Sequence, residues 1–304
     1  MDPRTQPLVG PMPLTPEWRE ARRHLITATD VAAILGQSEY RTALDVFAEK
    51  TGRVEPFAGN EATRRGTRYE PVILADYAEQ VGAELRHPLP LIIHPTLACL
   101  GATPDAERLD DGRLIEAKLS MSPARARELG EEGTDHIPDD WHLQVQTQLA
   151  CCERDTADLA VLLYGRLRVY TIQRHDVLIG IILDAAKEMA ERVGGDDPPE
   201  PDWHHARTPA LIRGLYDLRH GEAVMLPQPC EAVYAAYVDL GEQEKRLKAE
   251  REEAKARLLY ALGDAEIGRL PGIGVELIRQ EVNRKGYEVK ETSFIQLRTR
   301  KVKA

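Results

Sequence analysis

Two short apolar runs that end in ionisable residues constrain the fold of this chain more than any other feature. The first run leads into Pro104-Asp105, and the second carries Glu116-Ala-Lys118 shortly afterwards. Alternate side chains of a β-strand share a face, so Glu116 and Lys118 are expected to point one way while their neighbours point into a core. The sequence therefore predicts two carboxylates and one ammonium gathered at one edge of a sheet.

Such a group of side chains has a specific chemical use. Carboxylate oxygens are hard ligands that hold Mg²⁺, and the bound metal polarises a phosphate and acidifies a water molecule, which a nearby lysine positions or deprotonates. The pattern therefore indicates metal-assisted hydrolysis of a phosphodiester. Two ordinary interpretations stand beside it, because Pro-Asp is a common turn and Glu-x-Lys on a half-exposed strand is usually a solvated ion pair.

Length and composition limit the class of protein. The chain has 304 residues, more than one typical domain, and its 42% hydrophobic content can bury a sizeable core. No apolar run is long enough for a membrane span and no cationic-then-apolar signal opens the chain, so we expect a cytoplasmic protein without a membrane partner. The cysteines show no zinc spacing and are expected to be reduced and structural: Cys99, Cys151, Cys152 and Cys230.

The net charge of −10 argues against nonspecific nucleic-acid binding over the whole surface. The charge is unevenly distributed, however. Residues 18–70 carry nine Lys and Arg against eight Asp and Glu, and residues 241–304 carry fifteen against eleven. Most of the acidity therefore falls between these two regions, and a local basic track for DNA stays compatible with the sequence.

The chain divides by composition into four segments. Residues 1–17 are rich in proline and are expected to form a flexible tail, and residues 18–195 carry the periodic elements of a folded domain. A Gly- and Pro-rich stretch opens a linker over 196–230. Residues 231–304 are expected to form a helical extension with a small β element and a basic tail.

One carboxylate lies on the apolar face of an expected helix. The helix covers 61–80, and Ile73, Leu74 and Tyr77 follow Glu70 at helical spacing, so Glu70 shares their face. An inward carboxylate is unfavourable unless it is paired or bound to metal. A glutamate at the rim of that face, reaching solvent, is an equally good interpretation.

A second helix is expected over 139–152, with Gln144 and Gln148 beside its core face. Side-chain amides in such places are commonly rim residues that hydrogen-bond locally, and alone they favour that interpretation. A polar, mobile loop is expected over 121–140. The apolar runs predict strands at 89–94, 98–103, 114–119, 159–164 and 167–173, the last two as a hairpin.

The extension contains a long helical pattern with apolar residues at near-heptad spacing. It runs over 231–262 and is interrupted by Glu244 and Arg251. We expect one arm of a helical hairpin that packs on its own chain, with an oligomer seam as the alternative. Residues 273–278 and 287–289 are expected to form the small β element.

The order of these elements resembles the YqaJ-like viral recombinases, the lambda-exonuclease branch of the PD-(D/E)-x-K nucleases. The fold implied is α/β, a restriction-endonuclease-like core with a mixed central sheet flanked by helices and a mainly helical C-terminal extension. The resemblance covers roughly residues 18–195. The matching segments are Trp18-Arg-Glu-Ala-Arg22, Ile26-Thr-Ala-Thr-Asp-Val-Ala-Ala-Ile-Leu-Gly36, Gly66-Thr-Arg-Tyr-Glu70, Pro104-Asp105, Glu116-Ala-Lys118 and Gln144-Val-Gln146.

The resemblance implies a metal site. Asp105 and Glu116 would be ligands of Mg²⁺, with Mn²⁺ as a substitute, and the backbone carbonyl of Ala117 would assist. Glu70 would be an outer or second-metal carboxylate, and Lys118 would activate the attacking water. No iron–sulfur cluster is expected, because the four cysteines are scattered along the chain.

The resemblance also assigns an amide and an end-binding site. Gln144 would orient the attacking water, while Arg22 and Thr29 would hold a terminal 5′-phosphate, which suits an arginine fork and a hydroxyl. Two departures concern the second metal site. Ala106 stands where the family often has glycine, and an upstream acidic residue has no clear equivalent around His94-Pro-Thr-Leu97.

The function implied is Mg²⁺-dependent hydrolysis of DNA, as a 5′-to-3′ double-strand exonuclease in phage-type homologous recombination. The resemblance further implies a phage or prophage protein in the bacterial cytoplasm, a trimeric ring and a single-strand annealing protein as partner. An endonuclease or a single-strand nuclease of the same superfamily is an alternative. A non-catalytic DNA-binding or assembly protein is the alternative from another class.

Overall fold

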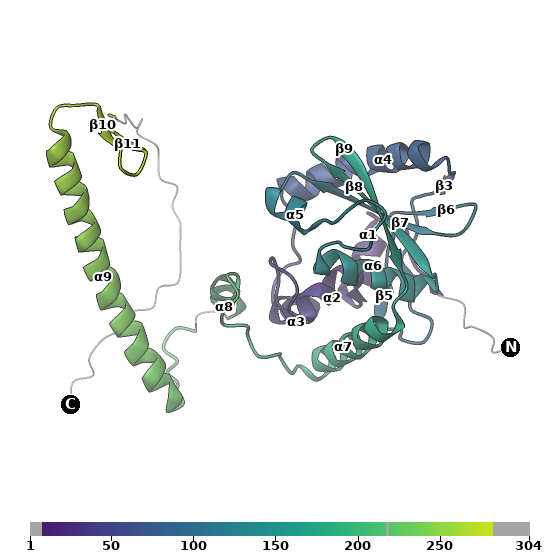
Figure 1. The fold of residues 1–304 in the computed structure, drawn as a ribbon. Coiled ribbons are helices and arrows are strands. Elements are labelled where there is room, and N and C mark those ends of the chain that lie inside the picture. The colour runs from purple at the N-terminus through teal and green to yellow at the C-terminus, as the bar shows by residue number, and fades with distance from the viewer. Residues whose placement is uncertain (1–7, 217–218, 282–304) are drawn as a thin grey trace. The chain divides into compact units, whose positions relative to one another are not determined.

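The computed structural model describes residues 8–216 and 219–281, and the chain forms two units, Met1–Asp217 and Leu218–Ala304 (Figure 1). The division between the units falls within the expected linker, which also contains a helix, α8 (Thr208–Leu215). Among the described residues, no helix combines the length and the apolar character needed to cross a membrane.

A mixed five-stranded sheet forms the centre of the first unit, in the order β3-β6-β7-β8-β9. The two long central strands, β7 and β8, run parallel, and all other neighbours in this sheet are antiparallel. The expected hairpin of the last two strands is confirmed. The strands are β3 (Leu85–Arg86), β6 (Ala106–Arg108), β7 (Leu114–Ser120), β8 (Thr156–Leu163) and β9 (Arg166–Gln173).

Two helices cover opposite faces of this sheet. On one face α4 (Glu61–Val81) buries Ile73, Leu74 and Tyr77 against Ile115 of β7, which confirms the expected apolar face of the helix. On the other face α6 (Asp139–Cys152) buries an apolar row against alternate strand residues; the contacting residues include Val145, Leu149, Leu114, Leu159 and Val161. The alternation along β7 therefore separates two cores, as the strand pattern predicts.

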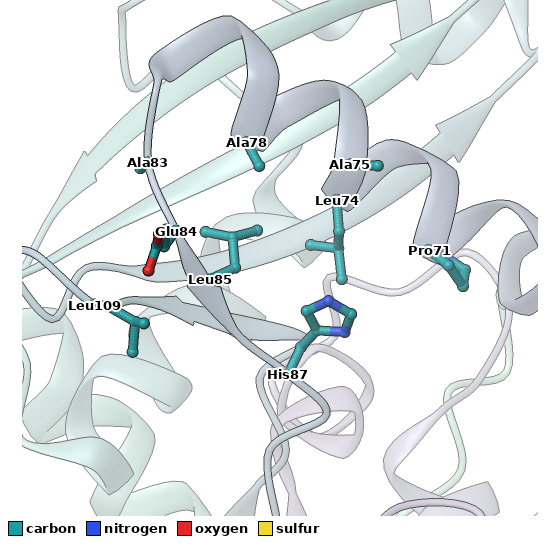
Figure 2. A pocket seen from close by; sticks show the side chains of 9 residues that line it. All are labelled: Pro71, Leu74, Ala75, Ala78, Ala83, Glu84, Leu85, His87 and Leu109. Atoms are coloured by element: carbon teal, nitrogen blue, oxygen red, sulfur yellow. The ribbon is translucent and has the colours of Figure 1, made fainter.

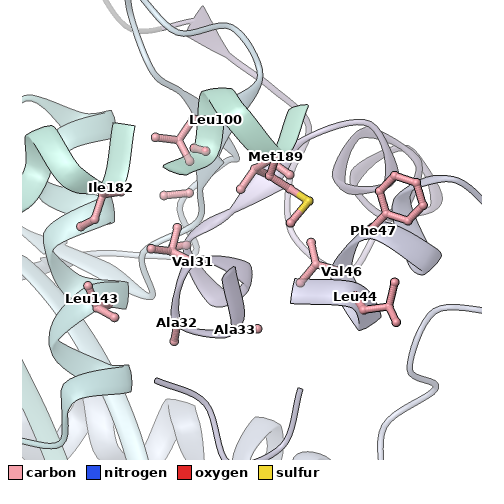
Figure 3. Close-up of a cluster of buried hydrophobic side chains, with 14 of the residues drawn as sticks. Val31, Ala32, Ala33, Leu44, Val46, Phe47, Leu100, Leu143, Ile182 and Met189 are labelled. Atoms are coloured by element: carbon pink, nitrogen blue, oxygen red, sulfur yellow. The ribbon is translucent and has the colours of Figure 1, made fainter. Parts of the chain in front are cut away.

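A smaller sheet and a second group of helices complete the unit. The sheet has the order β1-β4-β5-β2, and β4 is shorter than expected because the flanking Pro90 and Pro95 cannot donate ladder hydrogen bonds. Apolar side chains from α2, α3, β5 and α7 form one cluster beside it (Figure 3). The elements are β1 (Leu8–Val9), β2 (Ile26–Thr27), β4 (Ile92–Ile93), β5 (Leu100–Ala102), α2 (Ala28–Ile34), α3 (Ala43–Lys50) and α7 (Asp176–Gly195).

Local hydrogen bonds determine where the N-terminal helices begin. Thr15 accepts a bond from the backbone N–H of Trp18 at 3.2 Å and so caps α1 (Pro16–Arg23). At α2 the backbone N–H and the hydroxyl of Thr27 both donate to Asp30, at 3.0 and 2.7 Å. Thr27 is therefore the N-cap of α2.

The segment expected as a mobile loop over 121–140 contains a short helix, α5 (Pro123–Glu128). Arg125 of α5 donates to both oxygens of Asp140, at 2.9 and 3.0 Å, and its guanidinium lies over the Trp141 ring. This bidentate contact ties the segment to the first turn of α6. The expectation of a loop is therefore wrong for residues 123–128, which form a helix.

The second unit consists, where described, of a long helix and a hairpin. The helix is α9 (Pro229–Leu262), followed by β10 (Ile267–Leu270) and β11 (Val275–Ile278), which pair antiparallel. No residue of α9 is buried within the described part of the second unit, and the expected packing of this helix on its own chain stays a prediction. The expected β element at 287–289 and the basic tail lie outside the described residues.

Candidate active site

Asp105 lies directly before β6, where this strand pairs with β7. Its backbone N–H donates to the carbonyl of Ile115 at 3.2 Å, and its Oδ2 accepts from the backbone N–H of Ala117 at 2.7 Å. These two bonds fix the carboxylate of Asp105 against the strand that carries Glu116 and Lys118. The Pro-Asp and Glu-x-Lys segments are therefore side by side, as their order in the sequence predicts.

The carboxylate of Glu116 is buried and is bonded on both oxygens. Its Oε1 accepts from Lys118 Nζ at 2.7 Å and from Gln144 Nε2 at 2.6 Å, and its Oε2 accepts from Gln148 Nε2 at 2.6 Å. Lys118 Nζ also donates to Gln144 Oε1 at 2.8 Å. Glu116 and Lys118 thus share the face covered by α6, and this helix supplies both amides.

Glu70 lies on α4 and is half-buried. Burial and the nearby charge of Glu116 raise the pKa of Glu70, while the charge of Lys118 acts in the opposite direction. Glu70 is therefore close enough to Glu116 and Lys118 for their charges to act on it. We call Glu70, Asp105, Glu116, Lys118, Gln144 and Gln148 the carboxylate site.

The electrostatics of this site are those of crowded acids. Burial, and then the charges of Glu116 and Glu70, hold the pKa of Asp105 well above its ordinary value. Burial alone would lower the pKa of Lys118, but the adjacent Glu116 raises it, so the lysine is an ammonium at neutral pH. One ammonium faces three carboxyl groups. The site therefore favours additional positive charge.

The donor atoms fit a hard divalent cation. Asp105, Glu116 and Glu70 offer only oxygen, and the carbonyl of Ala117 is adjacent, a set that suits Mg²⁺ or Mn²⁺. A cation would also relieve the repulsion that raises the pKa of Asp105. Among the described residues, no three His, Cys, Asp or Glu side chains already stand in a metal-holding arrangement. The Glu116 carboxylate is instead turned to its amide and ammonium partners.

A second polar site is formed where α1 meets α2. The guanidinium of Arg22 donates to the hydroxyls of Thr29 at 3.1 Å and Thr27 at 3.5 Å, and it stacks over the Trp18 ring at 4.5 Å. In the described chain it has no carboxylate within ion-pair distance, although Asp30 acts on it from further away. We call Trp18, Arg22, Thr27 and Thr29 the arginine site.

Buried ion pairs adjoin the arginine site and hold two of its residues in place. Asp30, which holds Thr27, is paired with Arg41 at 2.8 Å and with Lys50 at 3.0 Å. Lys50 also donates to the backbone carbonyl of Arg22 at 2.8 Å. The negative charge of Asp30 is thereby neutralised by other cations, so the guanidinium of Arg22 stays available to an outside anion.

One hydrogen bond connects the two sites. Trp18 Nε1 donates to Thr103 Oγ1 at 3.1 Å, and Thr103 precedes Pro104-Asp105. The ring that stacks on Arg22 is therefore anchored to the segment that carries Asp105. Gly101 allows this segment to pass close to the core, because a Cβ there would lie 3.2 Å from atoms of both Leu25 and Leu91.

Sequence reasoning missed several residues of these sites. Gln148 is only 1% exposed, so the rim interpretation is wrong for it, and its Oε1 has no partner in the described chain. The i, i+4 spacing from Gln144 was the signal that could have found it. Trp18 and Thr27 belong to the matched motifs but had no assigned role, and Thr103 had no signal at all.

A hollow of the first unit lies elsewhere. It has a volume of about 340 Å³ and lies between α4 and β3, lined by apolar side chains together with His87 and Glu84 (Figure 2). None of the residues of the carboxylate site lines it. The acids and amides described above therefore lie outside this hollow, on or beside the central strand β7.

Similarity to known proteins agrees with this geometry. Residues 17–155 match the family model described as the YqaJ-like viral recombinase domain. The similarity to this family is therefore shown for residues 17–155 of the chain. The domain contains every residue of both sites, and the resemblance expected from the sequence motifs is confirmed.

Two curated proteins are similar in sequence to this chain. The protein YqaJ of Bacillus subtilis (strain 168) is 26% identical over 257 residues, covering 83% of this chain and 79% of that protein. A protein of Acanthamoeba polyphaga mimivirus is 28% identical over 155 residues, covering 47% of this chain but only 27% of its own length. The similarity to the bacterial relative therefore extends well beyond the YqaJ-like domain.

A solved structure shares the fold. The alkaline exonuclease of Laribacter hongkongensis superposes with a TM-score of 0.51 at 25% identity, covering 60% of this chain and 94% of that protein. The predicted α/β class, with mixed sheets flanked by helices and a helical C-terminal region, is confirmed. Family and fold together support a nuclease.

Proposed function

We propose that this protein is a Mg²⁺-dependent deoxyribonuclease that digests duplex DNA from its ends in the 5′-to-3′ direction during phage-type recombination. The observation that carries the proposal is the carboxylate site. It gathers three carboxyl groups around a lysine and two amides, with the pKa of Asp105 raised by its acidic neighbours. Hydrolysis of a phosphodiester needs this combination of hard oxygen ligands and a positioned cation.

Each residue has a distinct role in this proposal. Asp105, Glu116 and the carbonyl of Ala117 would hold Mg²⁺, with Glu70 as an outer ligand. When bound, the metal would supply Lewis acidity and make water a better nucleophile. Lys118 would place its ammonium beside the attacked phosphate, and Gln144, which already bonds Lys118 and Glu116, would orient the water.

Gln148 has a positioning role in the same proposal. It donates to the second oxygen of Glu116 at 2.6 Å and so limits rotation of that carboxylate. Partners that orient a ligating carboxylate commonly affect metal affinity or activity by about 10–100-fold.

The arginine site would select the DNA end. A 5′-terminal phosphate monoester carries more negative charge than an internal phosphodiester and offers oxygens for a guanidinium fork and a hydroxyl. Arg22 and Thr29 would bind this terminal phosphate, and the Trp18–Thr103 hydrogen bond would keep the bound phosphate at a fixed position relative to Asp105. The polarity of digestion follows, because the 5′ end is the one held beside the carboxylate site.

The proposal also concerns how the protein assembles, and this part rests on the family resemblance. A trimeric ring around the DNA would keep the enzyme on its substrate between cuts, and a single-strand annealing protein would receive the product strand. The site of action would be the bacterial cytoplasm.

Digestion of linear, nicked and closed-circular duplex DNA, each with Mg²⁺ and with EDTA, tests the proposal. We expect Mg²⁺-dependent loss of the linear form alone, with Mn²⁺ as an effective substitute. Cleavage of the closed circle would indicate an endonuclease, and preferential digestion of single strands would indicate a single-strand nuclease. DNA binding without any cleavage would leave a non-catalytic DNA-binding protein.

A further inference from the structure

Part of the segment expected as a linker is packed against the apolar cluster of the first unit. We call residues 202–215, which include α8, the strap. Leu211 of α8 is buried in the cluster that α2 and α3 also line, and Ile212 and Leu215 pack against it. The strap lies outside the residues that match the family model, 17–155. Its contacts with α2 and α3 are therefore features of this chain that the family motifs do not describe.

Two polar side chains of the strap hold the connection between α2 and α3 on both sides of Arg41. Before Arg41, the Nε2 of His205 donates to the backbone carbonyl of Ser38 at 3.0 Å. After Arg41, the Nε of Arg207 donates to Asp45, in the first turn of α3, at 2.7 Å. The strap therefore limits how far this part of the chain, and Arg41 with it, can move.

The carboxylate of Asp45 depends on the strap for its charge balance. Its Oδ2 accepts from the backbone N–H and the hydroxyl of Thr42, at 2.9 and 2.8 Å. In the described chain its Oδ1 is paired with Arg207 alone. The side chain of Asp45 is 5% exposed, so water can replace little of this contact. A buried carboxylate is costly unless it is paired, and Arg207 supplies the pairing charge.

Arg41 is attracted by Asp45 as well as by its own partners. Its guanidinium donates to Asp30 at 2.8 Å and to Glu49 at 3.0 Å. Burial alone would lower the pKa of Arg41, but the charges of Asp30, Glu49 and Asp45 raise it. Asp45 is therefore near enough to act on Arg41 while Arg207 is in place. Without Arg207, the unpaired charge of Asp45 would compete with Asp30 for the same guanidinium.

The position of Arg41 in turn determines how much of the charge of Asp30 acts on Arg22. Asp30 is paired with Arg41 at 2.8 Å and with Lys50 at 3.0 Å, and its charge also reaches Arg22. If Arg41 moved toward Asp45, Asp30 would keep Lys50 and would attract Arg22 more strongly. An outside phosphate would then have to compete with Asp30 for the guanidinium of Arg22.

We propose that Arg207 is a positioning residue of the arginine site. It neutralises Asp45, and this keeps Arg41 on Asp30. Arg22 then stays open to a terminal 5′-phosphate. The inference rests on the proposed binding of that phosphate by Arg22, and it extends the functional part of the chain to the strap. Arg207 acts through its ion pair and is not a catalytic residue.

Binding of short duplexes to the full chain in Ca²⁺ tests this role without cleavage. Arg207→Ala is expected to weaken binding of a 5′-phosphorylated duplex roughly fivefold, the effect of about one lost hydrogen bond. Binding of the same duplex with 5′-hydroxyl ends should stay as in the unaltered protein. Arg213→Ala removes an exposed arginine from α8 and should leave both affinities unchanged. Arg207→Lys keeps a positive charge beside Asp45 and should retain most of the preference for the phosphorylated duplex.

A double variant tests whether Arg207 acts through Arg41. Arg41→Ala frees Asp30 directly and should lower the preference for 5′-phosphorylated ends by at least as much as Arg207→Ala does. Adding Arg207→Ala to it should lower the preference no further. Additive losses would overturn the coupling through Arg41. Circular dichroism shows whether each protein is folded, and if Arg41→Ala is not, the comparison of Arg207→Ala with Arg207→Lys still decides the proposal.

The outcomes separate this inference from the proposed function. An unaltered protein that binds 5′-phosphate and 5′-hydroxyl ends equally would refute end selection by the arginine site, and the role of Arg207 with it. A preference that is present in the unaltered protein and persists in Arg207→Ala would overturn the inference alone. Equal weakening on both kinds of end would show that Arg207 supports the fold without a role in end selection, which also overturns it.

Discussion

The carboxylate site and the arginine site lie in the same unit, yet their charges are balanced in opposite ways. In the carboxylate site, Glu116 receives hydrogen bonds from Lys118, Gln144 and Gln148, so its charge is compensated within the protein. In the arginine site, the guanidinium of Arg22 contacts two hydroxyls and an aromatic ring among the described residues, while its acidic neighbour Asp30 is paired with other cations. One site is closed on itself and the other is open to an anion.

This difference teaches what each site is suited to do. Buried charges are costly unless paired, so a catalytic carboxylate is held by partners that keep it in one orientation. A recognition cation is better left with weak partners, because a strong internal ion pair would have to break before the ligand binds. Our predictions test whether the two sites do separate work, in order of decreasing effect.

The largest effect is expected at the centre of the carboxylate site. Asp105→Ala removes a proposed metal ligand, so turnover should fall by more than the roughly 100-fold upper value for outer partners. DNA affinity measured in Ca²⁺ should largely survive, because the arginine site is intact. Asp111→Ala, an exposed carboxylate on the β6–β7 turn, is the matched control and should be active. Appreciable Mg²⁺-dependent cleavage by Asp105→Ala would remove the assignment of this site.

The next effect concerns the support of the arginine site. Asp30→Asn leaves the buried Lys50 without its ion-pair partner and removes one of the two carboxylates paired with Arg41, which keeps Glu49, so the free energy of unfolding should fall by about 3–5 kcal/mol. Urea denaturation at neutral pH measures this change. Asp196→Asn breaks the exposed ion pair with Arg53 and should lower the free energy of unfolding by at most about 1 kcal/mol.

The same ion pairs predict a pH dependence of stability. Burial alone would raise the pKa of Asp30, but Lys50 and Arg41 hold it well below its ordinary value. Their contribution is therefore complete above the unfolded value of about 3.9 and is lost as pH falls below it. The stability of the Asp30→Asn protein should therefore lack this part of the decrease at acid pH. An unchanged acid dependence in this variant would show that other carboxylates account for it.

A smaller effect, on selectivity, is expected from Arg22→Ala. Charge-assisted hydrogen bonds contribute about 1.5–3 kcal/mol each, so digestion of 5′-phosphorylated duplex ends should fall by roughly 10–150-fold. Ends with a 5′-hydroxyl never offer this contact and should be affected much less. Arg23→Ala, an exposed neighbour on α1, is the control. Equal losses on both kinds of end would mean that Arg22 binds backbone phosphates without selecting the end.

The smallest effect is expected from the bond that connects the sites. Trp18→Phe keeps an aromatic ring for Arg22 to stack on but loses the N–H group that donates to Thr103. The lost hydrogen bond is worth about 1 kcal/mol, so the rate of digestion of 5′-phosphorylated ends should fall roughly fivefold. Thr103→Val should lower this rate by the same factor, and the double variant should lower it no further than either single change. Additive losses would show that the two residues act separately and that the sites are not coupled through this bond.

The elements of the fold were largely readable from local patterns. The period of two along β7 placed Glu116 and Lys118 on one face, and the helical spacing around Glu70 placed Ile73 and Tyr77 in a core. The hairpin of β8 and β9 and the bounds of α6 were predicted for the same reason. Errors occurred where prolines shortened strands and where Arg125 tied an expected loop to α6.

The site was readable only in part. Motifs identified Asp105, Glu116 and Lys118, and the structure brings them together; their roles remain predictions that the variants above test. Gln148 was judged a rim residue because a helical pattern shows which face a side chain is on but not what covers that face. Its burial depends on the depth at which α6 packs on the sheet.

Sequence by itself determined which side chains share a face, because the periods of strands and helices are set by backbone geometry over a few residues. It determined the strand that carries the catalytic candidates and the repeat along α9. Only the tertiary structure decided which faces meet. The contacts of Asp30 with Lys50, of Trp18 with Thr103 and of Gln148 with Glu116 join residues far apart in the chain. Such contacts depend on how whole helices and strands pack against one another, and no local sequence pattern encodes which elements meet.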